Sequence, residues 1–271
     1  MPEGLNLVYE TIDESNKDKS ASTRRQLVAG AAATLGGLGL LGLVDTAKAD
    51  YRYNDVQKIL NIAATAEILA TIVNTVGAEK VNLVDDVTRR NVRAAAREEL
   101  VHYQVLTGSL GAKPLTKKIW VPDAVFASRT GLLSTLEVGD QIFVNAYLLG
   151  TITFGLKGLG VEAAVAAEFM GVEAVHRALA RQSLGKLGND RVFMKLDDKE
   201  GAPDAPNRGQ AGFQHIESAV SQLQAAGFGF GVPGKGKGQF YEFDTVSKRT
   251  PSAKDKDLRA LNQFTPDTPD R

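Results

Sequence analysis

The hydrophobic pattern of residues 50–185 repeats about every 3.6 residues, and this helical period restricts that region to packed α-helices. The pattern separates into four segments, which predict helices over residues 54–76, 83–106, 132–149 and 161–184. The connection of residues 109–122 is longer than a tight helix–helix turn needs, whereas the loop of residues 150–160 is short. We therefore predict an all-α four-helix bundle with a long crossover between its second and third helices.

The pattern changes after residue 185 and predicts a largely irregular extension. One short helix is expected over residues 213–226, and no stretch keeps the two-residue alternation of a strand. The glycine- and lysine-rich residues 234–238 lack the Ser/Thr and the strand-to-helix frame of a phosphate-binding loop, so we interpret them as a flexible loop. We expect residues 186–271 to wrap on the surface of the bundle and not to form a separate domain.

Residues 1–49 have the pattern of an export signal. Arg24 and Arg25 precede 18 uncharged residues, 27–44, and a small-x-small site at residues 47–49 predicts cleavage before Asp50. The pattern resembles a twin-arginine signal, which predicts a periplasmic or extracellular protein with no stable membrane span after cleavage. The alternative is an uncleaved transmembrane helix, because 18 residues are just long enough to span. Five glycines in the run weaken that alternative.

Charge and cysteine content exclude several classes of function. The chain has 32 basic and 32 acidic residues, so it lacks the basic surplus that nucleic-acid binding requires. It has no cysteine, which excludes thiolate nucleophiles and cysteine zinc sites. Any metal must therefore be held by histidine and carboxylate side chains, a ligand set that suits iron, manganese or zinc.

Two of the three histidines lie three residues after a glutamate on predicted helices, as Glu99/His102 and Glu173/His176. Residues at i and i+3 share a helix face, so each pair can converge on one ion. A single pair of this kind is commonly a surface feature, but two pairs on the second and fourth helices predict a carboxylate from each of the other helices. The first helix supplies Glu67, the only acidic residue in its apolar segment, where an unpaired charge would be costly.

The third helix offers two candidates for the remaining carboxylate, Glu137 and Asp140. Glu67 precedes Glu99 by 32 residues, Asp140 precedes Glu173 by 33, and Glu137 precedes Glu173 by 36. If the two helix pairs are equivalent hairpins, the spacing favours Asp140. Glu137 has the longer arm and is the alternative ligand, and both could contribute.

Other side chains next to the candidate ligands have less specific expected roles. Glu98 is expected on the outer face of the second helix together with several arginines. Tyr103 and Tyr147 adjoin the candidate ligands. We expect them to pack in the core with a partner for the hydroxyl, and a redox or supporting role is the alternative.

Residues 61–176 resemble the ferritin-like superfamily, in particular exported bacterial ferritin-like domain proteins that are similar to plant desiccation-related proteins. The matching segments are Ala66-Glu67-Ile68-Leu69, Glu98-Glu99-Leu100-Val101-His102, Asp140 with Ala146-Tyr147-Leu148, and Gly171-Val172-Glu173-Ala174-Val175-His176. The resemblance covers a little under half the chain and implies a bundle with a two-metal carboxylate centre. Asp140 departs from the usual glutamate and is one methylene shorter, which weakens the expected second metal position.

The resemblance implies two ions of iron or manganese. Glu67 and Asp140 would be terminal ligands, Glu99 and Glu173 would bridge, and each ion would take one histidine. The expected function is then oxidation of ferrous iron or removal of peroxide or oxygen. Two alternatives remain: a non-enzymatic structural or desiccation- and stress-protective protein, and a buried polar network without metal. We expect a monomer or dimer.

Overall fold

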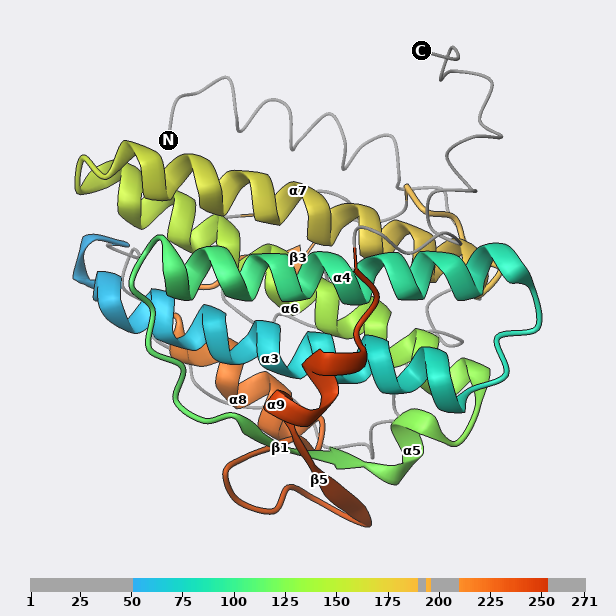
Figure 1. The fold of residues 1–271 in the computed structure, drawn as a ribbon. Helices are drawn as coiled ribbons and strands as arrows, with labels where there is room; N and C mark the ends of the chain where they lie inside the picture. The colour runs from blue at the N-terminus through green and yellow to red at the C-terminus, as the bar shows by residue number, and fades with distance from the viewer. Residues whose placement is uncertain (1–50, 190–193, 196–209, 253–271) are drawn as a thin grey trace.

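Four long helices form the centre of the computed structural model, which describes residues 51–189, 194–195 and 210–252 (Figure 1). The helices are α3 (Val56–Lys80), α4 (Asp86–Gly108), α6 (Arg129–Leu156) and α7 (Gly160–Ser183). α3 packs mainly on α4, and α6 packs mainly on α7. These two hairpins confirm the predicted helical bundle. The predicted export signal of residues 1–49 lies outside the described residues.

Three of the long helices begin at a side chain that caps them. Asp55 accepts a hydrogen bond from the backbone N–H of Lys58, and Asp85 accepts one from that of Thr88, both at 2.7 Å. Ser128 caps α6 in the same way. Each cap satisfies a backbone donor that the first helical turn leaves unpaired, so it sets where the helix starts.

The crossover between α4 and α6 runs the length of the bundle, as the sequence predicted. Near its beginning, the N–H of Lys113 donates to Asn61 at the start of α3, at 2.6 Å. Beyond its end, Leu132 lies against Gly77 at the other end of α3. α6 therefore runs antiparallel to α3. The crossover contains two short elements, β1 (Lys118–Pro122) and α5 (Asp123–Phe126).

The crossover strand β1 is the centre of a small antiparallel sheet that the sequence pattern did not indicate. Its partners are β4 (Gly229–Phe230) and β5 (Gly238–Glu242), more than one hundred residues later in the chain. Ile119 lies opposite Tyr241 on β5 and Phe230 on β4. Ile119 and Val121 are almost fully buried and fasten the sheet to the bundle. Strands of two to five residues are too short for an alternation of apolar and polar residues to be recognisable in the sequence.

The glycine-rich segment between β4 and β5 packs closely on Trp120, where we expected a flexible loop. A Cβ atom on Gly234 would lie 2.0 Å from the carbonyl oxygen of Gly227 and 2.7 Å from the Trp120 ring. A Cβ atom on Gly238 would lie 2.5 Å from the carbonyl oxygen of Val121. Glycine is required at these two positions because the backbone approaches the indole and the neighbouring strand too closely for a side chain.

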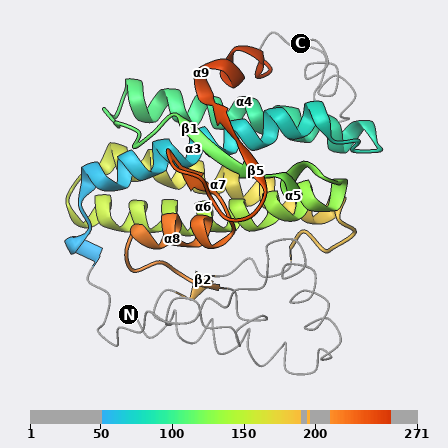
Figure 2. The same ribbon diagram turned by 90° about the horizontal axis from the view of Figure 1, so that it is seen from below.

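The rest of the C-terminal extension covers the bundle on the side of α3 and α6. Its other elements are β2 (Met194–Lys195), β3 (Gln210–Ala211), α8 (Glu217–Ala225), α9 (Phe243–Val246) and η2 (Ser247–Arg249), whereas η1 (Tyr51–Tyr53) precedes α3. α8 packs on α6, and the sheet lies across α3 (Figure 2). Because α3 is covered on both sides, it is apolar around most of its circumference.

Among the described residues, α3 alone is long and apolar enough to cross a membrane. Its most apolar window is 89% buried inside the protein, as in the core helix of a bundle. The apolar composition of α3 is therefore explained by the protein segments that cover it on both sides.

Candidate metal centre

The bundle brings the predicted ligand residues into its interior from all four long helices. α3 carries Glu67, α4 carries Glu99 and His102, α6 carries Asp140, and α7 carries Glu173 and His176. All six are buried, and the three glutamates have a fractional exposure of 0%. The interior of the bundle thus encloses a cluster of carboxylates and imidazoles.

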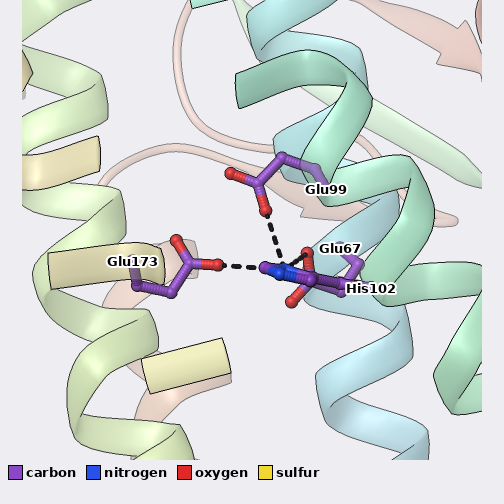
Figure 3. Close-up of side chains that lie close together, drawn as sticks. All are labelled: Glu67, Glu99, His102 and Glu173. Atoms are coloured by element: carbon purple, nitrogen blue, oxygen red, sulfur yellow. Dashed lines mark ion pairs between the residues drawn. The ribbon is translucent and has the colours of Figure 1, made fainter. Parts of the chain in front are cut away.

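The first half of the cluster is built around His102. Its Nδ1 atom lies 3.5 Å from Glu67 Oε2, 3.5 Å from Glu99 Oε2 and 3.3 Å from Glu173 Oε1. Figure 3 shows the three carboxylates pointing toward the imidazole from three different helices. One donor atom from each of these four residues lies within 4.8 Å of the others, which is close enough for a single ion to contact them all.

The second half is built around His176. Its Nδ1 atom lies 3.1 Å from Glu99 Oε1 and 3.6 Å from Glu173 Oε2. Glu99 and Glu173 therefore each present one oxygen to His102 and the other to His176. Two carboxylates placed in this way could each contact ions on both sides. Asp140 lines a cavity together with His176, and its carboxylate interacts electrostatically with His176 and Glu173.

The buried donor atoms of the cluster lack hydrogen-bond partners. They are Glu67 Oε2, both carboxylate oxygens of Glu99 and of Glu173, His102 Nδ1 and His176 Nδ1. A buried polar atom without a partner costs about 1–3 kcal/mol, and a charged one costs more. Cations held between these atoms would satisfy them, so the residues present fit a metal centre of nitrogen and oxygen ligands.

The charges of the cluster make the metal-free site rich in protons. Burial raises the pKa of Glu67 and of Asp140 well above their usual values, and neighbouring carboxylates add to the shift. Burial lowers the pKa of His102, but Glu67, Glu173 and Glu99 outweigh it and raise that pKa to about 12. The pKa of His176 is raised by Glu99, Glu173 and Glu98 in the same way, against the effect of burial. Protons thus balance negative charge that a metal ion would otherwise balance.

Three side chains outside the predicted ligand set hold the ligands in place. Glu98 lies 2.7 Å from His176 Nε2, which directs Nδ1 of that ring into the cluster. The Tyr147 hydroxyl donates to Glu67 Oε1. Phe169 stacks on the His102 ring, with their centroids 3.9 Å apart.

Sequence reasoning placed one of these three correctly and missed the other two. Tyr147 has the core position and the hydroxyl partner that we expected. Glu98 is half-buried against His176, and the expected outer-face position is wrong for this residue. Consecutive helical residues point about 100° apart, so Glu98 can reach α7 while Glu99 points inward. Nothing in the sequence pattern singled out Phe169.

The two third-helix candidates occupy different surroundings. Glu137 forms ion pairs with Arg181 and Lys186 near the end of α7, so its carboxylate is already neutralised. Asp140, one turn later, lines a cavity with His176 and interacts electrostatically with Arg177 as well as with His176 and Glu173. The structure therefore favours Asp140 by position, and a metal-binding role for either residue stays a prediction.

Comparison with known proteins gives one match. A family described as ferritin-like domain matches residues 54–186, which contain all four long helices and the six predicted ligands. Searches of curated proteins and of solved structures gave no match.

Proposed function

Because residues 54–186 belong to the ferritin-like superfamily, we propose that this protein binds two ions of iron or manganese inside the bundle. We further propose that it oxidises ferrous iron or removes peroxide or oxygen. The observation that carries the proposal is the set of unpartnered donor atoms arranged on both sides of Glu99 and Glu173. No other arrangement of charges in the described part of the chain offers so many buried donors to one small volume.

The six residues would hold the two ions as follows. Glu67 and His102 would hold one ion, Asp140 and His176 the other, and Glu99 and Glu173 would bridge them. Ions held by these residues would supply the electrons that reduce a small oxidant. With ferrous iron and peroxide the overall reaction is two Fe²⁺, one H₂O₂ and two protons to two Fe³⁺ and two waters.

Metal analysis of the mature protein purified from the cells that produce it tests the proposal. Two equivalents of iron or manganese per chain are expected, and a protein that contains neither and binds neither would overturn the proposal. Metal-loaded protein should then consume peroxide or oxygen when ferrous iron is supplied. If it binds both ions but consumes neither oxidant, the non-enzymatic stress-protective function is the better account.

Metal binding should release protons and become stronger as the pH rises. In the metal-free protein the pKa values of His102 and His176 are raised, so both rings are protonated at neutral pH. An ion binds only an unprotonated Nδ1 atom, so a lower pH favours the protonated, metal-free form. Calorimetric titrations in two buffers of different ionisation enthalpy should show net proton release. Binding without proton release would contradict the protonation of the two rings.

We also propose that the protein acts outside the cytoplasm, on the basis of the twin-arginine pattern in residues 1–49. Replacing Arg24 and Arg25 together with lysine should keep the precursor in the cytoplasm, because the export receptor reads the arginine pair. Cell fractionation should show the unchanged protein exported, with Asp50 as its first residue. An unchanged protein recovered at full length in the membrane fraction would favour the transmembrane alternative.

A further inference from the structure

The polar contacts between α4 and α7 include one at an end of the bundle and one at the centre (Figure 1). Thr88 Oγ1 near the start of α4 and Ser183 Oγ at the end of α7 share a hydrogen bond of 2.9 Å. Further along α4, Glu98 Oε2 lies 2.7 Å from His176 Nε2 on α7. The two helices therefore run antiparallel, and their facing sides lead from the end of the bundle to the centre.

Between these two contacts the facing sides of the helices carry small side chains. On α4, Asn91 and Ala95 follow Thr88 at intervals of three and four residues, so the three share one face of the helix. On α7, Ala180 lies one turn before Ser183. Small side chains on both helices leave space between them.

A cavity of about 30 Å³ occupies this space, and we call it the α4–α7 channel. Thr88, Asn91 and Ser183 line its outer end, and Asp140 and His176 line its inner end. Asn91 and Ser183 are half-buried, whereas Asp140 and His176 are at most 7% exposed. The channel thus extends from the surface of the bundle to two of the predicted ligands.

The equivalent stretch beside the His102 half carries larger apolar side chains. His102 and His176 are 74 positions apart, and the same offset relates Ala95 to Phe169 and Ala180 to Leu106. Phe169 and Leu106 line a cavity of about 10 Å³, and none of the six predicted ligands lines it. This smaller cavity therefore does not connect His102 to the surface in the way that the channel connects His176.

The lining of the channel suits a divalent ion that has lost part of its water. A volume of about 30 Å³ holds only one or two molecules the size of water, so a fully hydrated ion does not fit. Side chains that contain oxygen lie at the outer end, and a carboxylate and an imidazole lie at the inner end. Oxygen and nitrogen atoms of these kinds replace water around divalent metal ions.

A different cavity also reaches Asp140, from the side of α8, but its lining is less suited to an ion. Apart from Asn74, Thr135 and Asp140, its walls are apolar side chains and Gly139. An ion that lost water there would find few atoms to replace it, and an uncompensated charge in apolar surroundings is costly.

We propose that divalent metal ions enter the centre through the α4–α7 channel and reach Asp140 and His176 before they reach His102. The inference rests on the metal binding in the proposed function and adds to it the path that the ions take. The four long helices enclose the ligands, so the ions need such a path. The residues that define the path are not ligands of the centre.

Filling the channel without changing a ligand tests the proposal. Ala95→Leu places a larger side chain between the two ends of the channel. Ala166→Leu is the matched control, because Ala166 is also buried and lines the smaller cavity beside Phe169. Uptake of Co²⁺ by the metal-free protein is followed by stopped-flow absorption of the bound ion. Ala95→Leu should slow uptake at least about tenfold, because the added side chain must be displaced from packed surroundings. Ala166→Leu should leave the rate unchanged.

The rate of metal release distinguishes a blocked channel from a damaged centre. A block on the path slows entry and exit by the same factor and leaves the affinity and the metal content unchanged. Damage to the ligands would instead weaken binding and speed release. Release is measured by mixing loaded protein with an excess of a chelator. Ala180→Leu, which narrows the channel from α7, should give the same result if Ala95→Leu folds poorly.

The outcomes separate this inference from the proposed function. Two bound ions with equal exchange rates in the wild type and in both channel variants would overturn the inference alone. Slower exchange in the channel variants of a protein that consumes no oxidant would support the inference and overturn the proposed oxidation. A wild-type protein that binds no divalent ion would overturn both.

Discussion

Replacing Glu99 with glutamine should remove both metal ions from the centre. Glu99 presents one oxygen to His102 at 3.5 Å and the other to His176 at 3.1 Å, so it is shared by both halves. A neutral amide cannot bridge two cations, and its NH₂ group would point a donor at one of them. Loss of a partner behind a ligand costs about 10–100-fold in metal affinity, and loss of a bridging ligand should cost more. The Glu99→Gln variant is dialysed against a solution of the metal, and free metal is then removed. Elemental analysis should find almost no bound metal.

Substitutions of other carboxylates serve as controls for this result. Glu168→Gln removes the same charge from the exposed face of α7 and should keep both ions. Glu137→Gln should also keep both ions, because that carboxylate pairs with Arg181 and Lys186. Asp140→Asn should lose the ion of the His176 half and keep the other. Full occupancy in Glu99→Gln would refute the bridging arrangement.

Ending the chain after Leu187 should abolish cooperative folding of the bundle. The removed extension supplies six large side chains to the hydrophobic core, each at most 4% exposed: Phe213, Ile216, Leu223, Phe228, Phe243 and Val246. Burying a side chain of this size stabilises a protein by about 1.5–3 kcal/mol, so the loss is on the order of 10 kcal/mol. That is comparable with the total stability of a typical domain. The truncation would also uncover Ile119 and Val121 on the crossover strand.

Thermal unfolding followed by circular dichroism tests this prediction. The truncated chain should be insoluble or show no cooperative transition. Val232→Ser lies in the same extension but is 59% exposed in the unchanged protein, so it should alter stability by no more than about 0.5 kcal/mol. A truncated protein with the transition temperature of the full chain would show that the bundle is independent of the extension.

The sequence predicted the four helices because their period is a local property. Predicted and observed bounds differ by a few residues at most ends, and by seven at the end of α6 (Arg129–Leu156). The interior position of Glu67 was also predictable, since it is the lone acid on an apolar helix. The Glu-x-x-His spacing likewise placed Glu99 with His102 and Glu173 with His176 on inward faces.

Contacts between distant segments could not be predicted in the same way. The pairing of β1 with β4 and β5 joins short strands more than one hundred residues apart, and no local alternation marks them. The choice between Glu137 and Asp140 depended on where Arg181 lies across the α6–α7 interface. The role of Glu98 depended on how closely α7 approaches α4.

The sequence by itself therefore determined the helices, the crossover and the inward-facing acids and histidines, because these follow from spacings within one helix. Only the tertiary structure decided that Glu99 and Glu173 each face both histidines. It also decided that Tyr147 donates to Glu67 and that Phe169 stacks on His102. These properties depend on which side chains meet when two hairpins pack, and that packing depends on every interface of the bundle at once.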